Sequence, residues 1–222
     1  MLSFIKAESF KLSKKLKSWL GPLLVMVLVL IAFPLSIDIS QYDLDKFYFS
    51  IIVVSLLMTA FVATEGMFEE DFEDGSLEQE FLKEKDFYKL VISKIFVYVC
   101  LIGIPIAFIG ALFSFANGVA VASFGKVFLL LILSNLLLFN LFAFGNALSI
   151  NKGAMLGVLS SLPLALPVII LLGRAIRSIQ YEDGFFAVTT LMVGIGLMVS
   201  AIMPLIISAA LKTHIDLSLI HI

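Results

Sequence analysis

The chain has 222 residues, of which 61% are apolar and only 14% are charged, and its net charge is −2. A soluble domain averages about 45–50% apolar and about 25% charged residues, because polar groups have to cover much of its surface. The composition therefore excludes a water-soluble enzyme, a disordered chain and a collagen-like fibre, and the charge argues against nucleic-acid binding. Lipid is the expected solvent for most of the protein.

Residues 1–19 are predicted to form an amphipathic helix that lies in the membrane interface. On a helical wheel, a wedge of about 100° contains Leu2, Ile5, Leu12, Leu16 and Trp19, and the lysines of this segment fall outside it. Such a helix directs its lysines to lipid headgroups and places a tryptophan at the boundary. A plain basic flank of the first membrane span is the alternative that the sequence leaves open.

Residues 20–211 are predicted to form six membrane-spanning helices. A spanning helix needs about 20 apolar residues. Six segments without a charged residue qualify: Leu20–Ile37, Phe47–Thr64, Ile95–Phe115, Val127–Leu148, Ala154–Leu172 and Phe185–Leu211. A charge at mid-bilayer costs about 2.5–3.5 kcal/mol, so its absence from all six is informative. The predicted fold class is an all-α membrane protein that ends in a short tail, residues 212–222.

Lysine and arginine predict the orientation of these spans. With the N-terminus inside, eleven of the 15 basic residues fall on the inner side and four on the outer side. Both termini are therefore expected to be cytoplasmic. Arg174 and Arg177, in the predicted outer loop before the last span, go against this trend, and Glu182 and Asp183 are candidates to pair with them.

The largest polar segment, Glu65–Leu90, is predicted to carry a protein-docking surface on the cytoplasmic side. It holds ten of the 17 acidic residues. Phe68 and Phe72, like Leu77 and Phe81, are four residues apart and therefore share a helical face. An acidic loop that only keeps this end soluble explains the carboxylates but not four exposed apolar residues in an ordered pattern. Because anionic headgroups repel carboxylates, a protein partner is favoured over the membrane surface.

Two short helices are expected within this segment. Asp74-Gly75 should end the first helix, and Ser76, with Gln79 three residues later, should cap the second. The predicted docking surface comprises Phe68, Glu69, Glu70, Phe72, Asp74, Gly75, Ser76, Leu77, Glu78, Gln79 and Phe81.

The chain lacks the motifs of an intrinsic energy source. It has no phosphate-binding loop, and the predicted spans contain no Asp, Glu or Arg for ion coupling. Its two histidines, His214 and His221, lie in the tail, and Cys100 is its one cysteine. No catalytic, cofactor-binding or metal-binding residue is predicted. A passive subunit that a partner drives fits this pattern best.

Several spans contain residues suited to bending or close packing. The predicted hinge and packing positions are Pro105, Pro163, Pro167, Gly196, Ser200, Pro204 and Ser208. Proline removes a backbone hydrogen bond from a helix, and small residues at intervals of four allow close helix contact. Asn135 and Asn146 share a face of the fourth span. They either line a path or, as we favour, bond a neighbouring helix.

The chain resembles a known protein family, most clearly in the acidic loop. The stretch from Phe68 to Gln79 reads FEEDFEDGSLEQ and is similar to the signature loop of the haem exporter protein B (CcmB) family. Further matches with consistent spacing are FPLSI at 33–37, GIP at 103–105, KG at 152–153, LPL at 162–164, Pro167, Pro204 and AAL at 209–211. Ala154 departs from the pattern, where a second glycine is expected.

The resemblance implies the membrane subunit of an ABC transporter for cytochrome c maturation, with ABC-2-type exporter architecture. The docking surface would be the coupling helix for a CcmA-like ATPase, which would bind ATP. Haem would be handled by the complex, together with CcmC-like and CcmD-like subunits and a CcmE-like haem chaperone. Two copies of this chain per complex are expected, and no cofactor is expected on the chain itself.

Two other functions stay open at this point. One is an ABC-2-type exporter for a lipid, glycan or drug, and the other is a membrane assembly scaffold without a transport path. The expected location is a bacterial inner membrane, with the mitochondrial inner membrane as the alternative.

Overall fold

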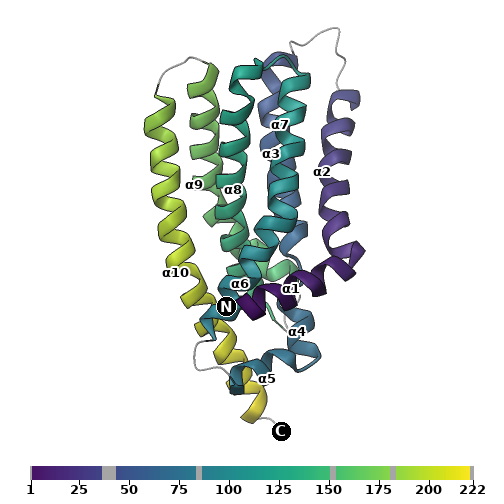
Figure 1. Cartoon of the computed structure of the whole chain (residues 1–222), viewed down its shortest axis with the longest axis vertical. Coiled ribbons are helices and arrows are strands. Elements are labelled where there is room, and N and C mark those ends of the chain that lie inside the picture. The colour runs from purple at the N-terminus through teal and green to yellow at the C-terminus, as the bar shows by residue number, and fades with distance from the viewer. Residues whose placement is uncertain (1, 37–43, 84–86, 151–153, 181–183, 221–222) are drawn as a thin grey trace.

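The computed structural model describes residues 2–36, 44–83, 87–150, 154–180 and 184–220, which are helical apart from short turns (Figure 1). The elements in chain order are α1 (Leu2–Lys14), α2 (Leu16–Ser36), α3 (Leu44–Thr64), α4 (Glu69–Glu73), α5 (Ser76–Lys83), α6 (Tyr88–Tyr98), the π-helical turn η1 (Val99–Gly103), α7 (Ile104–Ala116), α8 (Val121–Leu148), α9 (Ala154–Gln180) and α10 (Phe185–Ile220).

The prediction of an N-terminal helix followed by six apolar spans is confirmed. Six helical segments are long and apolar enough to cross a membrane, namely Ser18–Ser36, Tyr48–Glu73, Tyr88–Ala116, Val121–Leu148, Ser160–Ile179 and Phe185–Asp216. The helix α1 is separate from the first span, because the chain bends at Lys15. It crosses the base of the bundle (Figure 1).

Two helices differ in extent from the sequence prediction. The helix α9 continues eight residues beyond Leu172, so Arg174 and Arg177 lie on its last turns and not in a loop. Glu182 and Asp183, their candidate partners, lie outside the described residues. The helix α10 also continues, from the last span into the predicted tail as far as Ile220.

The third span is one helix with a π-helical turn in its middle. Pro105 lacks an N–H, and its ring would clash with the carbonyl four residues earlier in a regular α-helix. The turn Val99–Gly103 ends two residues before Pro105 and includes the carbonyl of Leu101, four residues before the proline. The Nδ2 of Asn135 donates a 2.8 Å hydrogen bond to the carbonyl of Gly103. The favoured interpretation, that Asn135 bonds a neighbouring helix, is therefore confirmed.

The helix α8 is the centre of the bundle. It is apolar on all sides, as expected of a helix buried over most of its length, and it packs against α3, α7, α9 and α10. Its closest approach to another backbone is at Gly145, opposite Gly157 of α9. A Cβ on either glycine would overlap the carbonyl oxygen of the other, so only glycine allows this contact.

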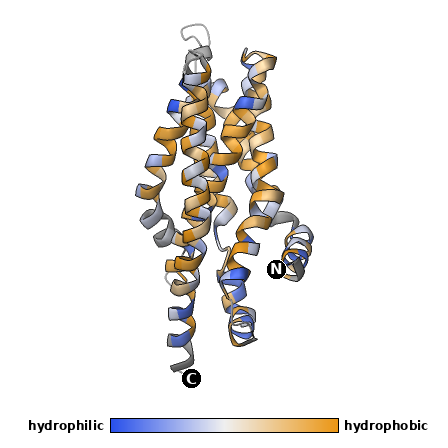
Figure 2. Cartoon of the chain, turned by 60° about the vertical axis from the view of Figure 1, so that its left-hand side comes forward, coloured by the Kyte–Doolittle hydropathy of each residue, from blue (hydrophilic) through white to orange (hydrophobic). Residues whose placement is uncertain are grey.

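Polar segments gather at one end of the bundle. The two termini, α1, α4 and α5 all lie at that end (Figure 1), and the hydropathy colouring shows the spans as mostly apolar and the α4–α5 region as largely hydrophilic (Figure 2). The fold thus places the predicted docking surface at the polar end of the bundle, beside both ends of the chain.

Candidate functional site

The turn between α4 and α5 forms where the sequence predicts it. Gly75 has φ +72°, a left-handed conformation that favours glycine, and it separates the two helices. Asp74, and not Ser76, accepts the N-terminal hydrogen bond of α5, because its Oδ1 receives the backbone N–H of Ser76 at 2.8 Å. The Ser76 hydroxyl instead donates to the carbonyl of Asp71 at 3.2 Å. Hydrogen bonding by Ser76 lowers the pKa of the Asp74 carboxyl.

The apolar residues of α4–α5 are covered by the chain itself. Phe68 is 0% and Leu77 1% exposed, and Phe72 and Phe81 are half-buried. The expectation that all four stand exposed was therefore wrong. Their periodicity identified the apolar face correctly, but the bundle, and not a partner, buries most of it. The membership of these residues in a docking surface stays a prediction.

Three other segments hold α4–α5 in place. The backbone N–H of Phe68 donates to Oδ1 of Asn146 in α8 at 3.2 Å, so this asparagine also bonds a neighbouring segment. The ring of Phe81 packs edge-on against Phe87 with centroids 5.6 Å apart. The Nζ of Lys212, in the continuation of α10, lies 5.6 Å from the Phe81 centroid.

Four charged residues form a charge junction between helices distant in the sequence: Glu8 and Lys11 of α1, Asp71 of α4 and Lys94 of α6. Lys94 is only 3% exposed and pairs with Asp71 and, at 2.9 Å, with Oε1 of Glu8. Lys11 also pairs with Asp71. A buried charge is tolerated only when it is paired and hydrogen-bonded. This junction therefore joins the N-terminal helix α1, the helix α4 and the third span to one another.

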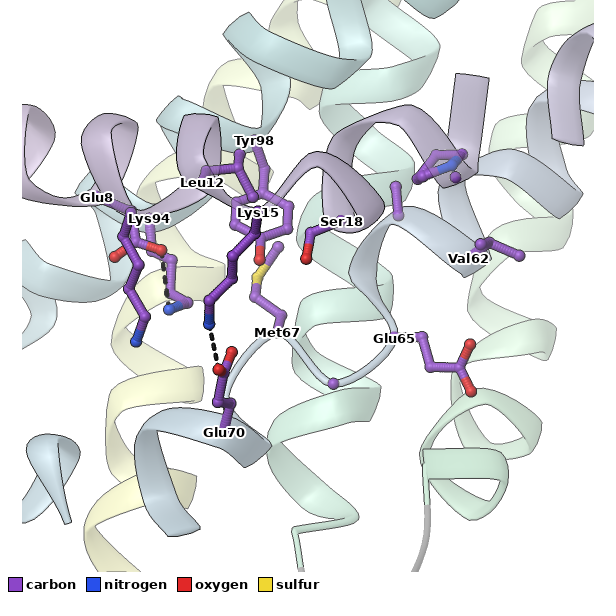
Figure 3. Close-up of a pocket in the computed structure, with 15 residues that line it drawn as sticks. Glu8, Leu12, Lys15, Ser18, Val62, Glu65, Met67, Glu70, Lys94 and Tyr98 are labelled. Atoms are coloured by element: carbon purple, nitrogen blue, oxygen red, sulfur yellow. Dashed lines mark hydrogen bonds and ion pairs between the residues drawn. The ribbon is translucent and has the colours of Figure 1, made fainter. Parts of the chain in front are cut away.

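A more exposed ion pair and a cavity lie beside the charge junction. Lys15, at the bend between α1 and α2, pairs with Glu70 of α4 (Figure 3). The cavity measures about 300 Å³ and is bounded by α1, the start of α2, the end of α3, the start of α4 and the α6 residues Lys94 and Tyr98. Its charged lining carries both signs, and no cluster of metal-ligating residues occurs in the described part of the chain.

Sequence reasoning missed the charge junction. Lys94 contributed only to the count of inner lysines, and Asp71 was left out of the docking surface. The available signal was the position of Lys94, at the edge of a span and within a helix, together with Glu8, an acidic residue in a lysine-rich segment. Neither pattern identifies the residue with which Lys94 or Glu8 pairs, because only the tertiary fold brings the three helices together.

The outer face of α4–α5 comprises the exposed residues Glu73, Asp74, Gln79 and Leu82. Leu82 is 73% exposed, so this face includes one large apolar side chain. Glu70 is exposed as well, whereas Glu69, Gly75, Ser76 and Glu78 are half-buried. The predicted docking residues are thus divided between an inner, structural face and an outer face that is free to meet a partner.

The predicted hinge and packing residues occupy different environments. Pro105 follows the π-helical turn, whereas Pro163 and Pro167 lie on the exposed side of α9. On α10, Gly196 faces Leu136 of α8, at 3.7 Å from a Cβ placed on it. Pro204 and Ser208 are buried, and the Ser200 hydroxyl is buried without a hydrogen-bond partner among the described residues. Their roles in bending or packing stay predictions.

Comparison with known proteins gives a consistent result. Residues 5–214 match the family model described as CcmB protein. The chain is 28% identical to heme exporter protein B of Haemophilus influenzae over 221 residues, which cover 97% of this chain and 98% of the relative. It is 30% identical to heme exporter protein B of Pseudomonas aeruginosa over 160 residues, 71% and 72% of the two chains. The corresponding Escherichia coli protein matches at 33% over 86 residues, 39% of each chain.

Proposed function

Because the chain belongs to the CcmB family, we propose that it is the membrane subunit of an ABC-type haem exporter that serves c-type cytochrome formation. A CcmA-like ATPase would supply the energy. CcmC-like and CcmD-like membrane subunits and a CcmE-like haem chaperone would complete the system, with two copies of this chain, in a bacterial inner membrane. This chain is then a transporter subunit and not itself a catalyst.

The observation that carries the proposal is the attachment of α4–α5 to the spans at several points. Phe68 and Leu77 are buried, Asp71 is paired to Lys94 of the third span, and Asn146 of α8 binds the start of α4. A force applied to the outer face of α4–α5 would therefore reach two spans directly. A loop whose only task was solubility would need none of these attachments.

The outer face also constrains the partner. Glu73 and Asp74 present two carboxylates, and Leu82 presents a large apolar side chain nearby in the sequence. A matching ATPase surface would carry basic residues around an apolar socket, because charge complementarity guides docking and a buried apolar anchor supplies affinity.

The experiment is co-purification of the ATPase with variants of this chain, combined with ATPase activity in lipid. Leu82→Asp should weaken association about tenfold or more, since it places a charge where an apolar anchor docks. The matched control is Val121→Asp, because Val121 is 74% exposed at the opposite end of the bundle. Equal retention of the ATPase by both variants would exclude docking through the outer face.

Two further outcomes separate the alternatives. A deletion strain that still attaches haem to c-type cytochromes would show that the cargo is another molecule, such as a lipid, glycan or drug. Partner ATPase activity that does not respond to this subunit in lipid would favour a scaffold without a transport path.

A further inference from the structure

A pocket of about 350 Å³ lies between α3 and α9, far from the charge junction. It is near the N-terminal end of α3 and the C-terminal end of α9, at the end of the bundle opposite α4–α5 (Figure 1). Its lining includes Phe49, Val53 and Val54 of α3 and Ile169, Gly173 and Arg177 of α9.

The pocket has Arg177 at one end, the hydroxyl residue Ser50 on its α3 side and an otherwise apolar lining. Ile169 and Arg177 are eight residues apart on α9, which corresponds to about 12 Å along the helix axis. Arg177 is near the end of the helix, and the lining deeper in the span is apolar. Binding sites for small molecules commonly combine an apolar wall with one or two polar groups that fix orientation.

Gly173 creates part of this space. A Cβ placed on it would meet nothing within 4 Å, and its backbone is not in the left-handed region. Glycine is therefore required there neither by the backbone nor by close helix packing, and it is less favourable than alanine inside a helix. The missing side chain instead leaves room between α3 and α9.

Arg177 has no charge partner within the part of the chain that the structure describes. It is exposed, and no described carboxylate lies within ion-pair distance of it. Arginine on the outer side also opposes the distribution that orients membrane proteins. Its planar guanidinium suits a bidentate contact with phosphate or carboxylate.

We propose that this pocket binds an anionic amphiphile, with its apolar body between α3 and α9 and its phosphate or carboxylate on Arg177. The polarity of the pocket matches such a molecule, whose anionic group stays near the membrane surface while its apolar part lies deeper. An outer-leaflet phospholipid and a haem, with its carboxylates, share this chemistry. Binding of haem at this site rests on the proposed function, whereas binding of a phospholipid does not.

The test uses the purified full-length chain in mild detergent, titrated separately with phosphatidylglycerol and with haemin. Thermal unfolding measures both ligands, and the haem absorption spectrum gives a second measure for haemin. Gly173→Leu should fill part of the pocket, since a Cβ at this position meets nothing within 4 Å, and Arg177→Gln should remove the anion contact. Each should weaken the response about tenfold or more, since a packed or charge-assisted contact is lost. The control is Arg174→Gln, an exposed neighbour on α9 that does not line the pocket.

The outcomes separate the sources and can overturn the proposal. If the wild type responds to phosphatidylglycerol alone, and Gly173→Leu and Arg177→Gln lose this response, the ligand is a lipid. If the wild type responds to haemin alone and the two variants lose that response, the ligand is haem, the proposed cargo. Equal responses in wild type and Arg177→Gln, or equal losses in Arg174→Gln and Arg177→Gln, would overturn the site. Arg177→Gln decides the matter even if Gly173→Leu does not fold. Since the assay contains no ATPase, its failure leaves the proposed ATP coupling intact.

Discussion

At the scale of single residues, the fold depends on how Lys94 is neutralised. Its ammonium group is buried between a carboxylate of α1 and one of α4. Taking such charges out of water costs several kcal/mol per ion, and the attraction between them offsets this only when the geometry is good. Removing one partner is therefore more harmful than removing a matched pair.

We predict that Lys94→Ala destabilises the protein by about 3–5 kcal/mol, because Glu8 would lose its ion pair with Lys94 and Asp71 would keep only the ion pair with Lys11. Chemical denaturation in detergent, followed by circular dichroism, measures this loss. The double variant Lys94→Met with Asp71→Asn removes one charge of each sign and should recover at least half of the stability.

The control for this prediction is Lys15→Ala. Its ion pair with Glu70 is more exposed, and pairs of that kind contribute about 0–1 kcal/mol. Similar losses for Lys15→Ala and Lys94→Ala would show that burial does not set the strength of these ion pairs.

Sequence patterns could locate the apolar and charged residues of α4–α5 but could not predict which residues they contact. The spacing of Phe68, Phe72, Leu77 and Phe81 identified the apolar face of the loop helices. Periodicity says which face is apolar, however, and not what covers it, and in this fold the chain's own helices do. The Glu8–Lys94 pair joins residues 86 positions apart, a relation that only the tertiary fold creates.

At the scale of elements, the six spans could be predicted because lipid imposes a strict rule. Charged residues are expensive inside the bilayer, so their absence marks the spans directly. The helix ends were less predictable. The predicted fifth span ends at Leu172, because Arg174 and Arg177 interrupt the apolar sequence after it. The helix α9 nevertheless continues to Gln180, because arginine is tolerated in a helix that reaches the membrane surface.

The contact of α8 with α9 gives a prediction at this scale. Gly145→Ala should lower stability by about 1–3 kcal/mol, since the added methyl group would overlap the carbonyl oxygen of Gly157 and force the helices apart. Thermal unfolding in detergent measures the change. Gly194→Ala is the matched control in α10, because its Cβ would meet nothing within 4 Å and alanine is the better helix former. Equal stability of the two variants would show that α8 and α9 do not need this close contact.

At the scale of the whole molecule, the loop helices α4 and α5 are attached to the bundle at several points. The charge junction joins them to α1 and α6, Asn146 joins them to α8, and Lys212 lies against Phe81 from α10. The π-helical turn lies in the same third span as Lys94, about two turns further along. Such turns interrupt the regular hydrogen-bond ladder, so this is where we expect the span to bend when the loop helices are pushed.

The orientation of the molecule follows from charge and gives the last prediction. With eleven basic residues on the side of the termini and four on the other, the α4–α5 end should face the cytoplasm. Since Cys100 is the one cysteine of the chain, Cys100→Ala gives a background for single-cysteine labelling. In intact cells an impermeant thiol reagent should label Val121→Cys, and it should label Glu73→Cys only after the inner membrane is opened. Both residues are exposed at opposite ends of the bundle, so accessibility alone does not favour either. The reverse pattern would place α4–α5 outside, out of reach of any ATPase that uses cytoplasmic ATP, and would remove the basis of the proposed coupling.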